Sequence, residues 1–530
     1  MTADENQLLL VKSPLTGNKR KPGFVDDGVN IATCFFDLFF VANLTSFTNA
    51  HEINSLSKLS SYVGFFSVLW LTWCQVTLYD VRFATDSVFE RVAHACYFGV
   101  MVGLAIIGPQ FDDPRTVPWS VLQELSLILM ASRAVLFFQY GTTLYFVWHY
   151  RASRRPLIAV MATLAIASLL YLAMSFAFYL HTASNAYFAW YVIAVCEVGA
   201  NLGIAKWSDA ISFQHTHLVE RMTCLTLIIL GEGIIGLCKT ITKIETLDFG
   251  FSPAAIGSVI SAVLIIYFLY QLYFDNVHLE PFDSLRQQIW AGLHFPFHLA
   301  LVLLMEGTNQ VFVWSHIAED VRKKLYALID LPANPTPQQF FNVWNSTITS
   351  VFEVFPSNQD VYDEVQRALQ VISPTSNATD AEANSELVTL VTDMSTVIFE
   401  GFGWEVPEIL ALISRMGTSP HSTKPYFCIS AGIVLISIGV LTFVAYGGDV
   451  HHHRNQFFRF LSISANILAG IGVALLSMAV LTGTSTTLGG TPWTLPMLVL
   501  LLLILLVINH IPDQQHSRQR DDPEFQSIYK

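Results

Sequence analysis

The sequence predicts an all-α fold, a polytopic transmembrane helix bundle of about twelve spans. Of its 530 residues, 53% are hydrophobic and 13% are charged, whereas soluble domains contain about 25% charged residues. Apolar runs long enough to cross a bilayer recur along most of the chain. Basic residues also alternate between successive loops, in the pattern that is typical of multi-pass membrane proteins.

This composition excludes a disordered chain, a disulfide scaffold and an ordinary cytosolic enzyme. The formal net charge of −13 argues against nucleic-acid binding, which favours basic surfaces. The seven cysteines are scattered, mostly inside apolar runs, as expected for small buried hydrophobic residues. No short apolar run with a cleavage site precedes the polar residues 1–28, so we expect the first span to direct membrane insertion. The sequence predicts no cofactor.

Twelve segments meet the requirement of about 20 mostly apolar residues for a spanning helix. They are 30–49, 60–80, 92–110, 119–148, 157–180, 187–205, 221–239, 253–275, 289–310, 425–446, 460–483 and 494–510. The fourth alone is long, which predicts a tilted or projecting helix. The expected organisation is a cytosolic tail (1–28), a nine-span core (29–310), an acidic extracytosolic cap (311–424), three C-terminal spans (425–510) and a second cytosolic tail (511–530).

The distribution of basic residues predicts the orientation of these spans. With the N-terminus in the cytosol, the cytosolic segments hold 17 of the 28 Lys and Arg residues, and the short outer loops hold four. Because Lys and Arg are enriched in cytosolic loops, this split predicts that both termini are cytosolic. The expected location is the plasma membrane or an endomembrane.

The long outer segment 311–424 contains 14 acidic and six basic residues. Apolar residues recur there at helical spacing from Phe341 to Phe355 and from Leu387 to Ile398, which predicts a small helical cap. N-glycosylation sequons begin at Asn345 and Asn377. Asn377, in a Pro/Ser/Thr-rich turn, is the better acceptor, because Asn345 borders an apolar face. The acidic surface has two open interpretations, a solvated domain and a vestibule that attracts cations.

Six ionisable residues fall inside the predicted spans, where charges are costly and commonly functional. They are Asp37, Glu124, Arg133, Glu197, Glu232 and Glu306. If all ionised, they would give the interior a charge of −4, which requires neutral acids, bound cations or access for water. One interpretation is a proton or cation pathway through Asp37, Arg133, Glu197 and Glu232. The alternative is that Arg133 pairs with one or two acids and that the other acids lie near the interfaces.

Gly231-Glu-Gly-Ile-Ile-Gly236 has the spacing of a dinucleotide-binding loop, but it lies in an apolar span rather than between a strand and a helix. We therefore expect its glycines to allow close helix packing, or a local unwinding around Glu232.

Two groups of residues have spacings compatible with a metal site, although such spacing is weakly specific. His294 and His298 are four residues apart, and Glu306 follows eight residues later. The second group is His215, His217 and Glu220.

Three stretches of the chain form a recognisable set. The first is Phe35-Phe-Asp37-Leu-Phe-Phe-Val41. The second joins Trp70-Leu-Thr-Trp73 to Tyr79-Asp-Val-Arg82-Phe-Ala-Thr-Asp86, and the third joins His217-Leu-Val-Glu220-Arg221 to Leu230-Gly231-Glu232. Together they resemble the low-temperature-requirement A family of multi-pass membrane proteins, over roughly residues 29–310. Arg133 also falls where that family tends to carry an arginine.

The chain departs from this family pattern at two positions. The pattern usually has Glu four residues before the first Asp, where this chain has Thr33, and Ser after the deep Glu, where it has Gly233. The resemblance implies no settled substrate or reaction. It does imply six motif residues: Asp37, Asp80, Arg82, Glu220, Arg221 and Glu232. The motif residues at the cytosolic mouth are Asp80, Arg82, His217, Glu220 and Arg221. The four charged ones could form an ion-pair network.

Three functions are compatible with the sequence. The leading hypothesis is a transporter or channel-like protein that resides in the lipid bilayer and moves an unknown small solute or ion. The second is a membrane-embedded enzyme whose His and Glu residues bind a metal. The third is a sensor or receptor that binds a ligand through the outer cap. The sequence has no clear internal repeat of the kind found in many transporters.

Overall fold

The computed structural model is helical, and the predicted all-α class is confirmed, with no strand among the residues it describes. These are 31–51, 53, 56–85, 87–111, 117–180, 186–208, 211–213, 216–246, 252–277, 284–329, 336–354, 359–373, 380–401, 423–446, 453–481 and 493–520. The expected polar tail 1–28 lies outside the described residues.

Each predicted span coincides with a helix. The twelve helices are α2 (Ile31–Ala50), α3 (Leu56–Phe83), α4 (Val88–Ile107), α5 (Trp119–Val147), α6 (Arg151–Tyr179), α7 (Phe188–Trp207), α8 (Leu218–Thr246), α9 (Pro253–Phe274), α10 (Ser284–Ile329), α15 (Thr423–Tyr446), α16 (His453–Leu481) and α17 (Thr494–Arg520). Within the described ranges, ten helices are long and apolar enough to cross a membrane, and α17 adds a shorter apolar stretch, Thr494–His510. The protein is therefore an integral multi-pass membrane protein.

Several helices are longer than their apolar runs. At 28 or 29 residues, α3, α6 and α8 match α5, so the expectation of a single long span is wrong. Similarly, α10 was expected to end at 310 but continues to Ile329. The polar flanks extend these helices because Lys, Arg and Glu are good helix formers and continue the backbone hydrogen bonding.

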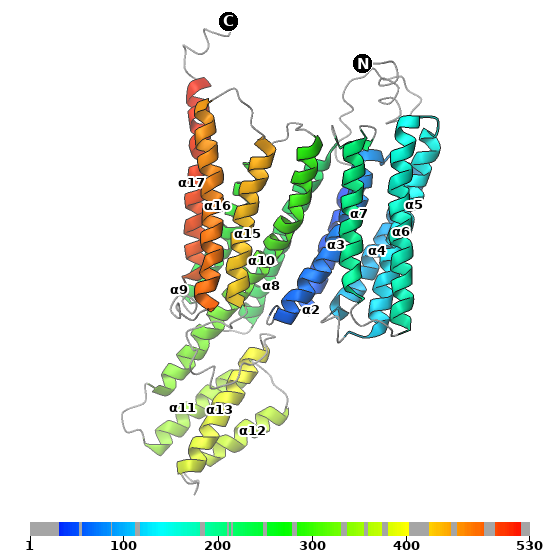
Figure 1. Cartoon of the computed structure of the whole chain (residues 1–530). Coiled ribbons are helices and arrows are strands. Elements are labelled where there is room, and N and C mark those ends of the chain that lie inside the picture. The colour runs from blue at the N-terminus through cyan, green and yellow to red at the C-terminus, as the bar shows by residue number, and fades with distance from the viewer. Residues whose placement is uncertain are drawn as a thin grey trace. The chain divides into compact units, whose positions relative to one another are not determined.

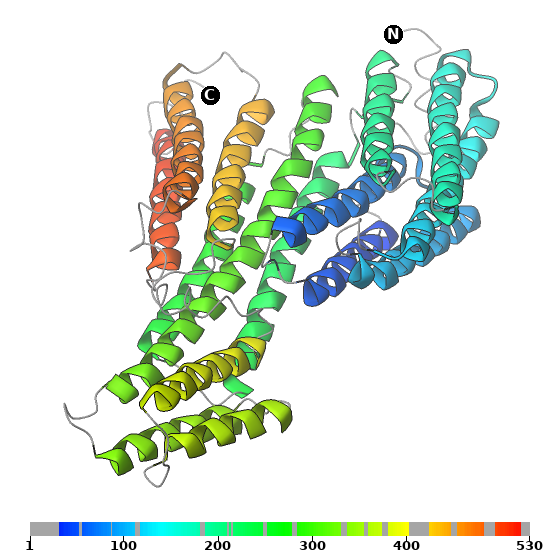
Figure 2. The ribbon, with the colours of Figure 1, turned by 60° about the horizontal axis from the view of Figure 1, so that its bottom comes forward.

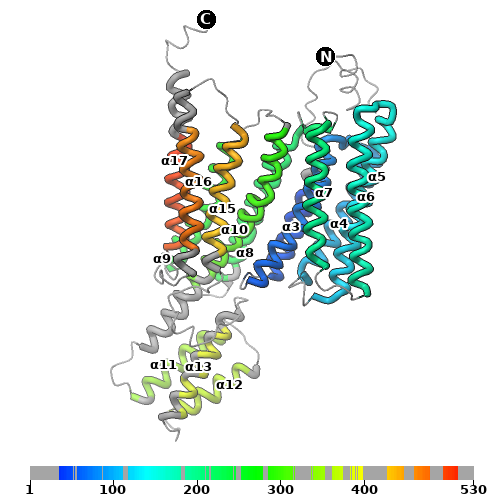
Figure 3. Tube along the Cα trace, viewed as in Figure 1, coloured from blue at the N-terminus to red at the C-terminus, as the bar shows by residue number. Residues whose placement is uncertain are grey.

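The chain forms two compact units, which are described separately. Unit 1 consists of Met1–Glu232, Tyr273–Leu301 and Val434–Ile467. In this unit α3 packs against α2, α5 and α7, and α4 packs against α2 and α5 (Figures 1 and 3). From Ser61 to Asp80 of α3, all side chains but one are buried. The surrounding helices expose large apolar side chains, such as Leu169 and Val192, as expected for a surface that faces lipid.

Unit 2 consists of Gly233–Leu272, Val302–Ile433 and Leu468–Lys530. It contains a cluster of three further helices (Figure 2), namely α11 (Pro337–Val354), α12 (Gln359–Val371) and α13 (Asp380–Gly401). Ile348 and Val351 of α11 and Leu390 of α13 are buried, on the apolar faces that helical spacing predicted. The sequence did not single out α12, whose Val365 and Leu369 are also buried.

One of the two sequons falls among the described residues. Asn345 is exposed on α11, although its neighbour Trp344 is buried. Its amide is therefore accessible, unlike what its apolar surroundings suggested. Asn377 lies outside the described residues. Glycosylation of either residue stays a prediction.

Replacing Asp393 of α13 by asparagine should stabilise the three-helix cluster at pH 7. Partial burial, together with the negative charges of Glu364 and Glu386, raises the pKa of Asp393 to about 6. Because the pKa is higher in the folded state, the ionised carboxylate destabilises the fold, and stability falls as the pH rises from about 4 to 6. We expect a gain of about 1 kcal/mol at pH 7, after allowing for solvent screening.

Hydrogen exchange of the α11–α13 amides measures this effect. Asp393→Asn should slow exchange at pH 7 relative to the unmodified protein and leave protection unchanged at pH 4. The exposed Asp363→Asn serves as the control and should change little. An equal effect of Asp393→Asn at both pH values would contradict the assignment.

Candidate functional site

Buried charge is concentrated in unit 1. Among the described residues, seven Asp, Glu and Arg side chains are buried, and all belong to this unit: Asp37, Asp80, Arg82, Glu90, Arg133, Glu197 and Arg221. The four acids and three arginines leave one net negative charge. Burial of ionised groups is costly without compensation, so this set is the principal candidate for a functional site.

This set differs from the six residues predicted inside the spans. Glu124 is exposed on α5, and Glu232 and Glu306 are only partly buried. The structure instead buries four groups outside that set, namely Asp80, Arg82, Glu90 and Arg221. They are enclosed because α3, α4 and α8 continue past their apolar runs. The buried set carries −1 rather than the −4 of the six predicted residues, because it lacks three of their acids and gains two other acids and two arginines.

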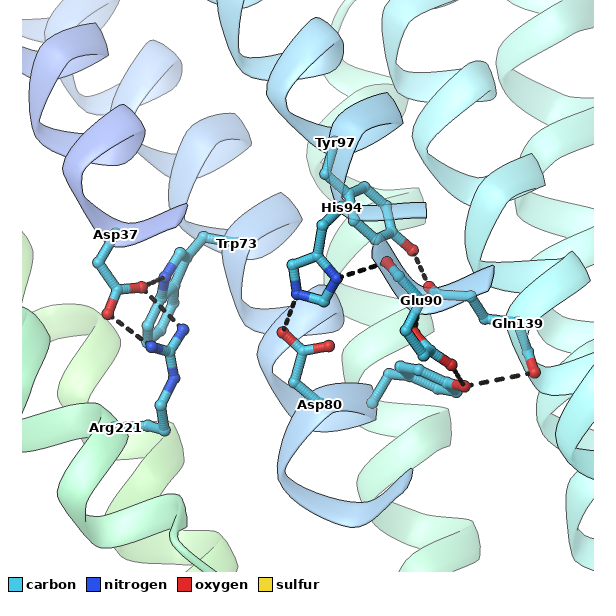
Figure 4. A network of polar contacts seen from close by, with 9 residues as sticks. Asp37, Trp73, Asp80, Glu90, His94, Tyr97, Gln139 and Arg221 are labelled. Carbon is cyan, nitrogen blue, oxygen red and sulfur yellow. Dashed lines mark hydrogen bonds and ion pairs between the residues drawn. The ribbon is translucent and has the colours of Figure 1, made fainter. Parts of the chain in front are cut away.

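The first ion pair joins α2, α3 and α8 (Figure 4). Arg221 donates two hydrogen bonds to the Asp37 carboxylate, from Nη1 to Oδ2 at 2.7 Å and from Nη2 to Oδ1 at 2.8 Å. The Trp73 indole Nε1 donates to Oδ1 at 2.7 Å, and its ring lies below the guanidinium. One residue from each of the three recognised sequence stretches thus meets in this cluster. Such a two-pronged, charge-assisted contact fixes the orientation of both side chains.

The second ion pair joins α5 and α7. Arg133 Nε lies 3.0 Å from Glu197 Oε2, and Nη1 donates to Thr72 Oγ1 of α3 at 3.0 Å. The guanidinium also lies 5.5 Å from the ring centre of Tyr171 on α6. Sequence reasoning expected Arg133 to face a deep acid, and the structure gives Glu197 as that acid.

A third cluster surrounds Asp80 on α3 and includes two residues that the sequence reasoning did not select, Glu90 and His94 of α4 (Figure 4). His94 Nε2 lies 3.6 Å from Asp80 Oδ2, and His94 Nδ1 lies 2.9 Å from the backbone oxygen of Glu90. The Glu90 carboxylate accepts hydrogen bonds from Tyr79 at 2.7 Å and from Gln139 at 2.6 Å.

A local sequence signal could have placed Glu90 and His94 on one face of α4. Ser87 caps α4 and accepts a hydrogen bond from the Glu90 backbone N–H, as in the Ser-x-x-Glu pattern at a helix start. That pattern places the start of the helix at Val88, which puts Glu90 inside its first turn. His94 then follows four residues later, on the same face.

Arg82 is buried without an acidic partner within salt-bridge distance in the described part of the chain. Its Nη2 donates to the Tyr140 hydroxyl at 2.7 Å and to Asn201 Oδ1 at 2.9 Å. Its Nε donates to the Leu78 backbone oxygen at 2.6 Å, and the Phe213 ring centre lies 4.5 Å from the guanidinium. Hydrogen bonds and aromatic rings therefore stabilise this charge.

The expected ion-pair network at the cytosolic mouth does not form. Arg221 pairs with Asp37, as described above, and Asp80 lies beside His94. The half-buried Glu220 lies 3.6 Å from the exposed His217 on the same helix turn. Arg221 and Asp80 therefore find their partners on other helices, whereas His217 and Glu220 contact each other locally.

Glu232 lies on α8, at the boundary of unit 1. It is half-buried, and the Thr45 hydroxyl of α2 lies 2.6 Å from its Oε2. A role for Glu232 in a pathway stays a prediction.

The histidines proposed as metal ligands have hydrogen-bonding roles in unit 1. Trp70 Nε1 donates to His298 Nδ1 at 3.0 Å, and His298 Nε2 lies 2.8 Å from the Thr226 hydroxyl. His294 contacts the Trp290 backbone oxygen and the Tyr273 hydroxyl, each at 2.8 Å. Over the ranges described, no group of three or more His, Cys, Asp or Glu residues is arranged to hold a metal. His215, from the second group, lies outside the described residues.

The glycines Gly231–Gly236 lie within the continuous helix α8, which is not the conformation of a dinucleotide-binding loop. In unit 2, a Cβ atom at Gly233 would lie 2.6 Å from Met305 Sδ, and one at Gly236 would lie 2.6 Å from Asn309 Nδ2. These glycines therefore allow α8 and α10 to approach closely.

The family comparison matches the part of the chain that carries all seven buried charges. A model of the family described as bacterial low temperature requirement A protein (LtrA) matches residues 34–330, from α2 to the end of α10. The comparisons with curated proteins and with solved structures gave no match. The three-helix cluster α11–α13 lies beyond the matched range. Because the match covers more than half of its length, the chain belongs to the LtrA family.

Proposed function

We propose that the protein is a transporter or channel-like protein with a proton or cation pathway along α3. The observation that carries this proposal is the set of buried polar side chains between residues 72 and 82 of that helix: Thr72, Gln75, Thr77, Tyr79, Asp80 and Arg82. The set extends over about 15 Å at 1.5 Å per residue, roughly half of the hydrocarbon core. Since the α3 window is apolar enough to span a membrane, a scaffold helix would not need so many polar groups.

Unsatisfied polar atoms on these α3 residues and on His94 of α4 support the proposal. Gln75 Nε2, Thr77 Oγ1, both Asp80 carboxylate oxygens and His94 Nε2 are buried without a hydrogen-bond partner. Such atoms are rare in folded proteins and call for a specific explanation. A pathway for protons or cations explains these unsatisfied atoms, because the polar atoms that line it exchange hydrogen-bond partners during transport.

The buried acids divide into two groups on this proposal. Asp37 and Glu197 are held by arginines, so they act as fixed groups that shape the pathway together with Arg133 and Arg221. Asp80 and Glu90 have no arginine partner in the described structure and are the groups proposed to carry charge. Glu232 remains a candidate for a further step.

Proton flux into proteoliposomes tests the proposal. Purified protein in vesicles with an internal pH dye should acidify the lumen when a K⁺ diffusion potential makes it negative. Asp80→Asn should lower this flux to that of protein-free vesicles. Glu124→Gln is the matched control, since it neutralises an exposed carboxylate on the spanning helix α5 and should keep the flux. Wild-type flux equal to that of protein-free vesicles would contradict the proposal.

We also infer from the charge distribution that both termini face the cytosol. In a chain with its seven cysteines replaced, Asn345→Cys should react with an impermeant maleimide from outside. Arg151→Cys should react only after the membrane is permeabilised. Both positions are exposed in the structure. Labelling of the Arg151 position in intact cells would contradict this orientation.

A further inference from the structure

His94 differs from His294 and His298 in what its ring nitrogens face. His294 and His298 each lie between a group that accepts a hydrogen bond and a group that donates one, which suits a neutral ring. Both nitrogens of His94 face acceptors: Nδ1 the Glu90 backbone oxygen at 2.9 Å, and Nε2 an oxygen of Asp80 at 3.6 Å.

The two contacts of His94 require one more proton than a neutral imidazole and an ionised Asp80 together provide. A neutral imidazole has a single N–H, and the Glu90 carbonyl can only accept it from Nδ1. The lone pair of Nε2 would then point at an ionised oxygen of Asp80, which is repulsive. A proton on Nε2 makes this contact an ion pair, and a proton on Asp80 makes it a hydrogen bond once the gap closes from 3.6 Å to about 2.8 Å.

The charge balance of the buried set leads to the same conclusion. Four buried acids face three arginines, so the set carries −1 with His94 neutral and becomes neutral with His94 protonated. The charged and titratable groups around the pair are Glu90 and Tyr97 on α4, Tyr79 and Arg82 on α3, Tyr140 on α5 and Asp37 on α2. Of the two nearby arginines, Arg221 is held by Asp37, and Arg82 is directed to Tyr140 and Asn201.

We propose that the His94–Asp80 pair is the site at which the protein loads and releases the proton that it transports. This inference rests on the proposed function and names the groups that bind the ion. Uptake adds a proton from water to Nε2, which forms an imidazolium beside the carboxylate, and release returns the proton to water without any other bond changing. The side chains of His94 and Asp80 are 7% and 1% exposed, so the pair is nearly enclosed by protein.

The protonation state of His94 can be measured directly by ¹⁵N NMR on histidine-labelled protein in lipid. Of the 16 histidines, His94 is identified by the signal that is lost in His94→Gln. This signal should show both nitrogens protonated at low pH and one at high pH. In Asp80→Asn its midpoint should move down by about one pH unit or more, because the opposite charge is lost.

The exposed His149→Gln is the control, because it should remove a different signal and leave that of His94 in place. A His94 signal that remains neutral from pH 4 to 9 overturns the proposal. So does a titration that is the same in Asp80→Asn. If His94→Gln does not fold, the His94 signal is identified in wild type by its through-space contact to Tyr97. The comparison of its titration between wild type and Asp80→Asn then still tests the proposal.

Flux separates this inference from the proposed function. In proteoliposomes, His94→Gln should lose most of the flux and its dependence on pH. Wild-type flux with an unchanged pH profile in both His94→Gln and Asp80→Asn would overturn the loading site and leave transport intact. A titrating His94 in a protein without any flux would instead overturn the proposed function.

Discussion

Replacing Arg221 by leucine should destabilise the folded protein by about 3–5 kcal/mol, because Asp37 would remain buried without its counter-charge. Arg221 donates two hydrogen bonds to Asp37, at 2.7 and 2.8 Å. No other cation lies within salt-bridge distance of that carboxylate in the described structure. Reversible unfolding in mixed micelles measures the loss. The second change Asp37→Asn should restore part of the stability, because it removes the stranded charge.

A matched control separates this effect from the loss of any arginine. Arg155 is exposed at the start of α6, and Arg155→Leu should change the free energy of unfolding by no more than about 0.5 kcal/mol. If Arg221→Leu changed the free energy of unfolding as little as Arg155→Leu, the Arg221–Asp37 pair would not hold α2 and α8 together.

Replacing Arg133 by leucine should have a comparable cost, about 3–5 kcal/mol, since Glu197 would lose its partner in an equally buried setting. The rescue should be specific to each pair. Glu197→Gln should recover stability in the Arg133→Leu protein and not in the Arg221→Leu protein, and Asp37→Asn should do the reverse.

Double-mutant cycles on the two pairs give this answer from the same unfolding measurements, with coupling expected inside each pair and absent between them. Rescue of Arg133→Leu by Asp37→Asn but not by Glu197→Gln would show that the pairing is wrong.

The helices were predictable from the sequence because apolar runs of about 20 residues leave few alternatives in a bilayer. The residues at which the helices begin and end were less predictable. Arg82 and Arg221 follow or precede apolar runs, so loop positions were expected for them. They are buried because their helices continue and carry them between neighbouring helices.

The partners of the buried charges depend on which helix faces meet, and a single sequence contains little information about that. Arg133 could be selected as a deep cation needing an acid, but choosing Glu197 over Asp37 required the packing of α5 against its neighbours. His94 was missed for a different reason. Histidine is uncharged in a simple count, and its significance becomes visible only when both ring nitrogens are seen to face acceptors.

The central claim, that protons pass along the buried polar residues of α3, is tested most directly by the potential at which flux stops. In proteoliposomes with imposed K⁺ potentials and different internal and external pH, the account predicts that this null potential shifts by about 59 mV for each unit of pH difference. The shift should persist when Na⁺ and K⁺ are replaced by large organic cations. A null potential that follows the Na⁺ or K⁺ gradient and ignores the pH difference would contradict the account.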